Sequence, residues 1–271
     1  MATRMQAYRL AYDGTVYRGF QRQPDVQTVE GVLFDALRTL SILEGSAAKP
    51  DGYAAAGRTD AGVSAVAQTI SFRAPEWCSA AAVNSELPAS VRAWATADVS
   101  EEFHARVDAT SREYRYHLYA PGASEGRARK ALDRFVGIHD YHNLTPHDGR
   151  TTRELFEAGA RRDGEFLVLS VRADSFVREL VRRLVTVVER VATGVEEPEY
   201  VDRVLSDERL VGPDGIEPAP AEPLLLTDVA YPDVEFSVDE EAAESARTVF
   251  EKRRVEQLTG ARIAEDVRDW L

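Results

Sequence analysis

The sharpest chemical feature of the sequence is a short loop in which two glycines flank a carboxylate. Gly57 and Gly62 enclose Asp60, and Arg58 lies just upstream of it. Glycines permit a tight turn and the close approach of a ligand, and a carboxylate held on such a loop can act as a nucleophile. The alternative is an ordinary turn, in which Asp60 hydrogen-bonds its own backbone.

A strand rich in aromatic residues is the second candidate. The segment 112–119 favours a strand, whose period of two places Tyr114 and Tyr116 on one face and Arg115 and His117 on the other. Aromatic rings on a sheet near arginines can stack on unstacked nucleic-acid bases. The alternative is that the tyrosines are half-buried strand residues.

The third candidate is an arginine-rich helix. Ser175 is expected to cap a helix that runs to about Val191, with Gly194 just beyond its end. Arg178 and Arg182 are four positions apart and are therefore expected to share a face. An arginine at the rim of an apolar face usually requires a carboxylate partner, unless both belong to a solvated stripe.

Histidines and aspartates gather in one further segment. His139, His142 and His147 lie near Asp140 and Asp148, but their spacing matches no strong zinc signature, so structural histidines are favoured over a metal site. The sequence also has no Walker A loop and no G-x-G-x-x-G motif, which points to chemistry without a nucleotide cofactor.

Alternating strands and helices must position these residues. The alternation of Tyr8, Leu10 and Tyr12 predicts a strand that ends at the Asp13-Gly14 turn, and Thr28 is a plausible helix N-cap. Further strands are expected at 66–72, 166–171 and 224–231, and an acidic helical tail follows Pro232. This pattern predicts an α+β fold of two related subdomains, divided near residue 110.

The composition excludes several classes of protein. Hydrophobic residues make up 44% and aromatic residues 8%, as in globular proteins. No stretch reaches the roughly 18 apolar residues that span a bilayer, and residues 1–10 lack the apolar core of a signal peptide. Cys78 is the only cysteine, so no internal disulfide is possible and a cytoplasmic location is the default expectation.

The charge is unevenly distributed. The net charge is −13, and residues 194–271 carry 8 basic and 21 acidic residues, which leaves 25 of each sign in residues 1–193. Nucleic-acid binders are typically basic, but the neutral part can still present a local arginine surface. Because lysines are almost absent and carboxylates dominate, the composition favours a protein from a salt-rich cytoplasm over an ordinary acidic protein.

Taken together, these segments resemble the tRNA pseudouridine synthase A family over roughly residues 6–232. The matching motifs are spread along the chain: Tyr12-Asp13-Gly14, Gly19-Phe20-Gln21-Arg22-Gln23, the loop 56–63, Phe103-His104-Ala105-Arg106, Tyr114-Arg115-Tyr116, Phe176 with Leu180-Val181-Arg182, and 224–231.

The resemblance implies roles for individual residues. Asp60 matches the catalytic nucleophile, Arg182 the basic residue paired with it, Tyr114 the tyrosine that packs on the target base, and Arg58 an arginine that helps to evert the nucleotide. Further RNA contacts are expected from Gln21, Arg22, His104, Arg106 and Arg178.

The resemblance also implies a fold and a partner. The expected fold is a mixed, mainly antiparallel central sheet flanked by helices, in two pseudo-symmetric ferredoxin-like subdomains at 1–110 and 111–232, with residues 233–271 as a tail. The family implies a homodimer across which tRNA lies, and its redox-neutral reaction needs no cofactor. The sequence itself predicts neither a metal site nor a membrane span. The expected target is uridine in the anticodon stem-loop, at tRNA positions 38–40.

Three alternatives to this predicted function are open. One is a pseudouridine synthase that acts on another RNA, and a second is a non-catalytic RNA-binding module of the same fold. The third is an aspartate-dependent hydrolase, which would require a second catalytic carboxylate or a metal cluster.

The charge distribution generates a first prediction. In dilute buffer, repulsion among the carboxylates of residues 194–271 should loosen that segment; in molar KCl the Debye length falls to roughly 3 Å and the repulsion is screened. The melting temperature and the turnover of tRNA should therefore both rise from dilute buffer toward molar KCl. Full stability and peak activity in dilute buffer would contradict the halophilic interpretation.

Overall fold

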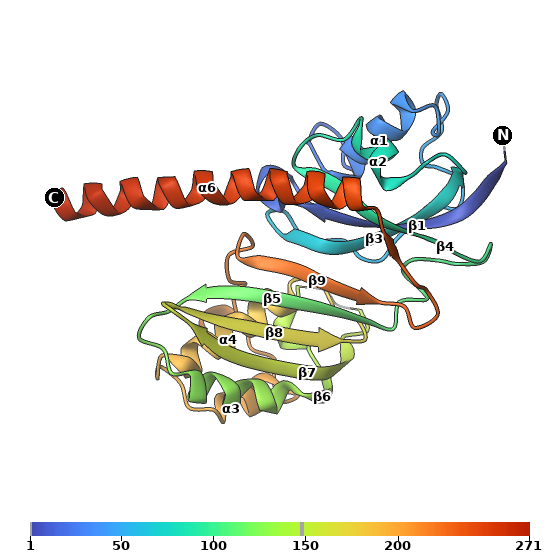
Figure 1. Cartoon of the computed structure of the whole chain (residues 1–271). Coiled ribbons are helices and arrows are strands. Elements are labelled where there is room, and N and C mark those ends of the chain that lie inside the picture. Colours follow the sequence, from blue (N-terminus) through green and yellow to red (C-terminus); the bar gives the residue numbers. More distant parts are fainter. Residues whose placement is uncertain (1, 147–148) are drawn as a thin grey trace.

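The protein forms one large sheet with helices packed against it (Figure 1). The structure is a computed structural model that describes residues 2–146 and 149–271. The strands are β1 (Thr3–Tyr12), β2 (Ala54–Ala55), β3 (Ser64–Pro75), β4 (Val91–Asp98), β5 (Ser111–Tyr119), β6 (Gly137–Asp140), β7 (Thr152–Asp163), β8 (Phe166–Ala173), β9 (Leu224–Ala230) and β10 (Ser237–Val238). The helices are α1 (Val29–Thr39), α2 (Ala80–Asn84), α3 (Glu125–Phe135), α4 (Leu180–Ala192), α5 (Tyr200–Val204) and α6 (Glu240–Trp270), and short 3-10 turns lie at Gly14–Val16, His142–Leu144 and Gly212–Asp214.

The two halves of the sheet meet at β3 and β9. The strand order is β10-β4-β1-β3-β9-β5-β8-β7-β6, with β2 paired to β3. Ser64 and Ala65 of β3 pair in parallel with Leu225 and Leu226 of β9, whereas the other described strand pairs are antiparallel. Because β3 starts directly after the loop 57–62, this topology places that loop at the junction of the halves.

Each half of the sheet has its own apolar core. In the N-terminal half, Tyr8 stacks on Phe72 with ring centroids 4.9 Å apart, and Leu37 of α1 is fully buried. In the C-terminal half, Leu132 of α3 and Leu184 of α4 are fully buried against the sheet. Burial of this apolar surface holds each set of helices to its part of the sheet.

The α+β fold with a mixed, mainly antiparallel sheet is confirmed. The predicted strands correspond to β1, β3, β5, β8 and β9. Thr28 caps α1 by accepting a hydrogen bond from the Gly31 N–H at 3.2 Å. Gly194 follows the end of α4 with a left-handed φ of 81°, as expected for the residue beyond a helix C-cap.

The arginine-rich helix begins later than predicted. Helix α4 starts at Leu180, because Glu179 takes a left-handed conformation with φ of 63°. Ser175 does not cap the helix; its N–H donates instead to the carboxylate of the preceding aspartate at 2.6 Å. Arg178 therefore lies before the helix and shares no helical face with Arg182, which corrects the prediction.

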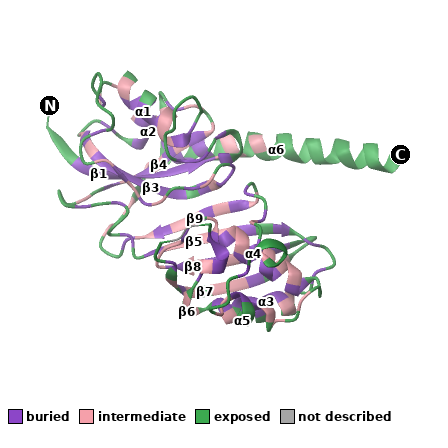
Figure 2. Cartoon of the chain, turned by 180° about the vertical axis from the view of Figure 1, so that it is seen from behind, coloured by how far each residue is buried: buried purple, intermediate pink, exposed green. Residues whose placement is uncertain are grey.

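The long C-terminal helix α6 is only partly packed. Ala242 and Ala246 are buried where the helix begins, and Arg253 forms an ion pair with Asp13 at 2.9 Å. Beyond this contact the helix extends into solvent (Figures 1 and 2). Leu258, Ile263 and Val267 are 55–59% exposed and Trp270 is 91% exposed, so these apolar positions of the tail do not pack on the described body of this chain.

The turn after β1 packs closely against the segment that leads into β3. A Cβ added at Gly14 would lie 2.0 Å from the backbone oxygen of Val63, a distance that requires one of the two backbones to move. Gly57, in contrast, has open space around the position of a Cβ.

This difference predicts the effect of two matched substitutions. Gly14→Ala should lower the free energy of unfolding by about 1–3 kcal/mol through overpacking, whereas Gly57→Ala should change it by less than about 1 kcal/mol. Thermal and denaturant unfolding of both variants measures the difference. Equal stability of the two variants would contradict the close packing of Gly14.

Candidate active site

The loop that carries Asp60 is fixed by contacts on both sides. Thr59 is buried, and its hydroxyl lies 2.8 Å from the Tyr12 hydroxyl. The backbone carbonyl of Thr59 accepts a hydrogen bond from the Phe20 N–H at 3.0 Å. At the start of the loop, the Gln68 side chain donates to the Gly57 carbonyl at 3.1 Å. The carboxylate therefore stands on a backbone anchored to β1, β3 and the segment before α1.

Asp60 faces a guanidinium from the other half of the sheet. One Nη of Arg182, in the first turn of α4, lies 3.6 Å from the Asp60 carboxylate. The Arg182 side chain is 17% exposed and that of Asp60 31%. The Nε of Arg182 donates to the Ala219 carbonyl at 2.6 Å, so the guanidinium is held from a second side.

Burial and neighbouring charges tune the carboxyl of Asp60. Burial raises its pKa above the ordinary value and is the largest influence; Arg182 opposes this shift, Glu179 adds to it, and Arg178 opposes it. A carboxylate that has lost part of its hydration but keeps a cationic partner is suited to act as a nucleophile.

Tyr114 lies between the two cores. It is half-buried on β5, and its ring meets the Phe176 ring edge-on with centroids 5.1 Å apart. Burial raises the pKa of the Tyr114 hydroxyl, and the charge of Asp60 adds to this effect, so the hydroxyl stays protonated at neutral pH. Tyr116, two residues on, is buried in the C-terminal core, so the predicted aromatic face is divided between the site and the core.

The residues expected to contact RNA are exposed. Gln21 and Arg22 follow Phe20, which is bonded to the Asp60 loop, and Arg22 also lies over the Phe34 ring at 5.5 Å. The other exposed members of the set are Arg58, His104, Arg106 and Arg178.

His104 and Arg106 form one local turn. The Arg106 N–H donates to Nδ1 of His104 at 3.2 Å, and the His104 N–H donates to the Asp108 carboxylate at 2.8 Å. Arg178 is 71% exposed and approaches Glu179 at 3.8 Å. Its charge also acts on Asp60, so it stands near the candidate site although it is not on α4.

The sequence predicted no role for Arg112, but in the structure its side chain links four backbone carbonyls by hydrogen bonds. Its guanidinium donates to the carbonyls of Ala56 (3.0 Å), Arg106 (2.8 Å), Ala109 (3.0 Å) and Asp174 (2.8 Å). Burial lowers the pKa of Arg112. Arg112 thus ties the start of the Asp60 loop to the turn that carries Arg106, and only its place at the head of an aromatic strand marked it in the sequence.

The histidine-rich segment does not form a metal site in the described residues. His139 contacts the Val136 carbonyl at 3.2 Å, and His142 approaches Asp140 at 3.6 Å. His147 and Asp148 lie outside the described residues. Within residues 2–146 and 149–271, no three histidine, cysteine, aspartate or glutamate side chains converge in a way that would hold a metal ion. In the same residues, no helix is both long and apolar enough to cross a bilayer.

Comparison with known proteins supplies the family. The tRNA pseudouridine synthase family model matches residues 131–232. A tRNA pseudouridine synthase A from Natronomonas pharaonis is 57% identical over 262 residues, 96% of this chain and 97% of the relative. A relative of the same name from Haloarcula marismortui is 53% identical over 98% of this chain and all of the relative. Another from Methanosarcina acetivorans is 36% identical over 96% of this chain and 97% of the relative.

The chain belongs to the tRNA pseudouridine synthase A family. The family is one of isomerases, which confirms the predicted enzyme class. The two more similar relatives come from halophilic archaea, in agreement with the interpretation of the acidic composition. Among solved structures, an archaeal box H/ACA Nop10–Cbf5 complex is similar at a TM-score of 0.35 and 15% identity, over 66% of this chain and 44% of that chain.

The electrostatics of Asp60 predict how turnover depends on pH. If turnover requires ionised Asp60, activity is lost as the pH falls through a pKa that burial has raised. Because Arg182 lowers this pKa, Arg182→Gln should move the acid limb of kcat/KM to higher pH and reduce kcat roughly 10- to 100-fold.

Arg178→Gln is the matched comparison. Arg178 also lowers the pKa of Asp60, but as a smaller influence, so its acid limb should move less in the same direction. The measurement is kcat/KM against pH for the three proteins. An acid limb that stays in place in Arg182→Gln would contradict the electrostatic role of Arg182.

Proposed function

We propose that this chain converts uridine to pseudouridine in the anticodon stem-loop of tRNA, with Asp60 as the nucleophile, Arg182 as its cationic partner and Tyr114 as the residue that packs on the target base. The observation that carries this proposal is the Asp60–Arg182 ion pair at 3.6 Å, formed across the junction of the two halves. Exposed Arg58, Arg106 and Arg178 supply cations for the phosphates of the RNA.

The reaction requires a nucleophile and a held base but no redox partner. It breaks the N-glycosidic bond of uridine, rotates the base and joins it again through carbon. The nucleotide must first leave its stack, which costs a few kcal/mol, and exposed Arg58 is suited to contact the displaced backbone. Asp60 then reacts as a carboxylate, Arg182 fixes its direction, and the Tyr114 ring retains the free base.

The competing functions are less well supported by this geometry. A non-catalytic RNA-binding module would not need to retain Asp60, Arg182 and Tyr114 around one point. A hydrolase would need a second catalytic carboxylate or a metal cluster; Glu179, whose charge acts on Asp60, is already in an ion pair with Arg183 at 2.6 Å. A synthase for a different RNA would share the same machinery, so the test must locate the modified uridine.

The remaining features of the proposal concern assembly and location. We propose that residues 1–110 and 111–232 are the two subdomains, since each supplies most of one apolar core. We also propose that the chain acts as a homodimer, as the family resemblance implies, and that it acts in the cytoplasm, the default expectation for a chain with one cysteine.

The direct test is to map pseudouridine at nucleotide resolution in tRNA transcripts incubated with the purified chain. New pseudouridine is expected on the 3′ side of the anticodon stem-loop. Modification confined to another part of tRNA would overturn the proposed target, and the absence of pseudouridine in every tRNA would overturn the activity.

Asp60→Asn tests the nucleophile. The amide is nearly isosteric but a poor nucleophile, so turnover should be abolished while the Kd for tRNA changes less than about threefold. Substantial turnover by the purified variant would show that Asp60 does not perform the chemistry.

Substitutions at Tyr114 test the role of its ring. Stacking on a base is worth on the order of 1–3 kcal/mol, and Phe keeps the ring whereas Ala removes it. Tyr114→Phe should therefore retain much more activity than Tyr114→Ala. Equal losses in steady-state turnover would point to an essential hydroxyl instead.

A further inference from the structure

Helix α4 begins from a strained residue whose side chain is tightly held. Glu179 has φ of 63° and makes no side-chain cap to the helix, a conformation that is strained for a residue other than glycine. Its carboxylate accepts two hydrogen bonds from Arg183, at 2.6 and 3.1 Å. The two side chains are only 15% and 16% exposed, so this ion pair is largely removed from water.

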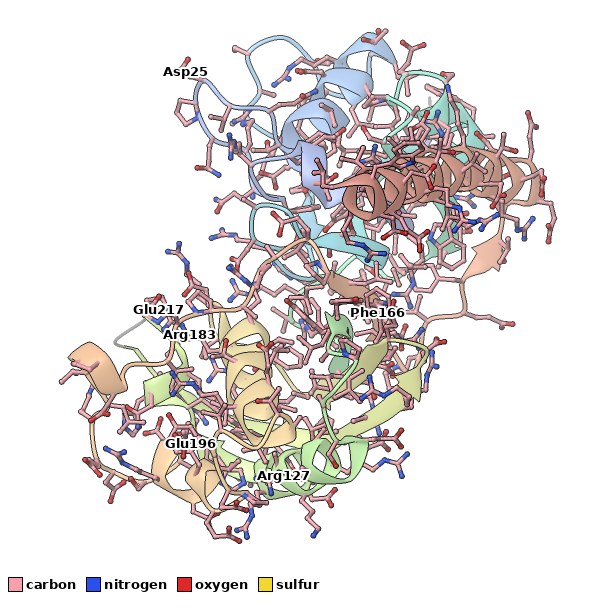
Figure 3. All side chains as sticks on the ribbon, turned by 90° about the vertical axis from the view of Figure 1, so that its left-hand side faces the viewer. Asp25, Arg127, Phe166, Arg183, Glu196 and Glu217 are labelled. Atoms are coloured by element: carbon pink, nitrogen blue, oxygen red, sulfur yellow. The ribbon has the colours of Figure 1, made fainter. Side chains whose placement is uncertain are left out.

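Arg183 and its neighbours attach α4 to the segment 216–219. Arg183 also donates to the Ile216 carbonyl, and Thr186 donates to the Glu217 carbonyl at 2.8 Å. Figure 3 shows Arg183 and Glu217 beside each other at the end of α4 that faces the N-terminal half. Contacts from the first two turns of α4 thus hold an otherwise irregular segment against the helix.

The same segment holds the cation of the active site. The Ala219 N–H donates to the Arg182 carbonyl at 3.1 Å, and the Ala219 carbonyl accepts from Arg182 Nε at 2.6 Å. Two residues further on, the chain reaches the Asp60 loop, since a Cβ added at Gly62 would lie 3.2 Å from the Ala221 side chain. The segment 216–221 therefore lies between α4 and the loop that carries Asp60.

We infer that Glu179 and Arg183 are a positioning pair for the reaction. By fixing the segment 216–219, they set the Ala219 carbonyl that aims Arg182 at Asp60. Neither residue touches the reacting atoms in this scheme, so both act through Arg182. The inference rests on the proposed roles of Asp60 and Arg182.

The pair also explains how an acidic residue is accommodated near the nucleophile. The charge of Glu179 acts on Asp60 against its ionisation. Arg183 supplies a full countercharge at 2.6 Å, and this leaves the charge of Arg182 for Asp60. An unpaired Glu179 would compete with Asp60 for the same arginine.

The test compares four variants with a matched control in steady-state kinetics on a tRNA transcript. The variants are Glu179→Gln, Arg183→Gln, the double variant of these two, and Arg183→Lys. The control is Arg129→Gln, because Arg129 likewise pairs with a glutamate four residues earlier, Glu125 at 2.7 Å, and donates to a distant carbonyl, that of Ala160 at 2.8 Å.

Loss of positioning should appear in kcat. We expect kcat to fall roughly 10- to 100-fold in Arg183→Gln, with KM within about twofold of the wild type. The double variant should lose no more than about twofold beyond Arg183→Gln, because both changes break one unit. Arg129→Gln should keep kcat within about twofold of the wild type. Arg183→Lys keeps a positive charge for Glu179 but replaces the planar guanidinium with a single ammonium group. Its kcat should therefore lie between that of Arg183→Gln and that of the wild type.

Several outcomes would overturn the inference. These are unchanged kcat in Glu179→Gln and Arg183→Gln, losses that multiply in the double variant, or an equal loss in Arg129→Gln. If Arg183→Gln does not fold, Glu179→Gln and Arg183→Lys carry the same comparison. A wild-type chain without activity on tRNA would instead overturn the proposed function, so the two failures are distinguishable.

Discussion

The candidate active site depends on one ion pair that joins the two halves of the molecule. Asp60 leaves the N-terminal half on a glycine-flanked loop, Arg182 comes from the first turn of α4, and their charged atoms meet at 3.6 Å. Burial alone would raise the pKa of Asp60 and favour its neutral form, and Arg182 opposes that effect. The short parallel pairing of β3 with β9 brings the two sources together, so the integrity of the junction and the reactivity of the carboxylate are linked.

The charge distribution shows how an acidic protein can serve an RNA substrate. Helix α6 carries eight acidic and six basic residues, many of them paired along the helix, so it contributes little to the net charge. The excess lies in residues 194–239, with thirteen acidic and two basic residues. That stretch includes the segment 216–221 beside the site, so screening by salt is expected to act where RNA approaches.

The sequence predicted most of the fold because alternating side chains along a strand and helix-capping residues are local signals. Tyr8, Leu10 and Tyr12 are an example of the first and Thr28 of the second. It also brought Asp60 and Arg182 together, through the family resemblance. The late start of α4 was missed, since the apolar spacing of 177–184 is helical throughout and a left-handed conformation at a glutamate such as Glu179 has no local sequence signal. Arg112 was missed because its partners are carbonyls remote in sequence.

The coupling between Asp60 and Arg182 is tested most directly by a double-mutant cycle of stability. Arg182→Ala leaves a partly buried carboxylate without its cation, at a cost of about 1–3 kcal/mol. Removing that carboxylate as well should recover stability, so the double variant Asp60→Ala with Arg182→Ala should unfold at a higher temperature than Arg182→Ala alone. Additive effects of the two substitutions on the free energy of unfolding would contradict the coupling.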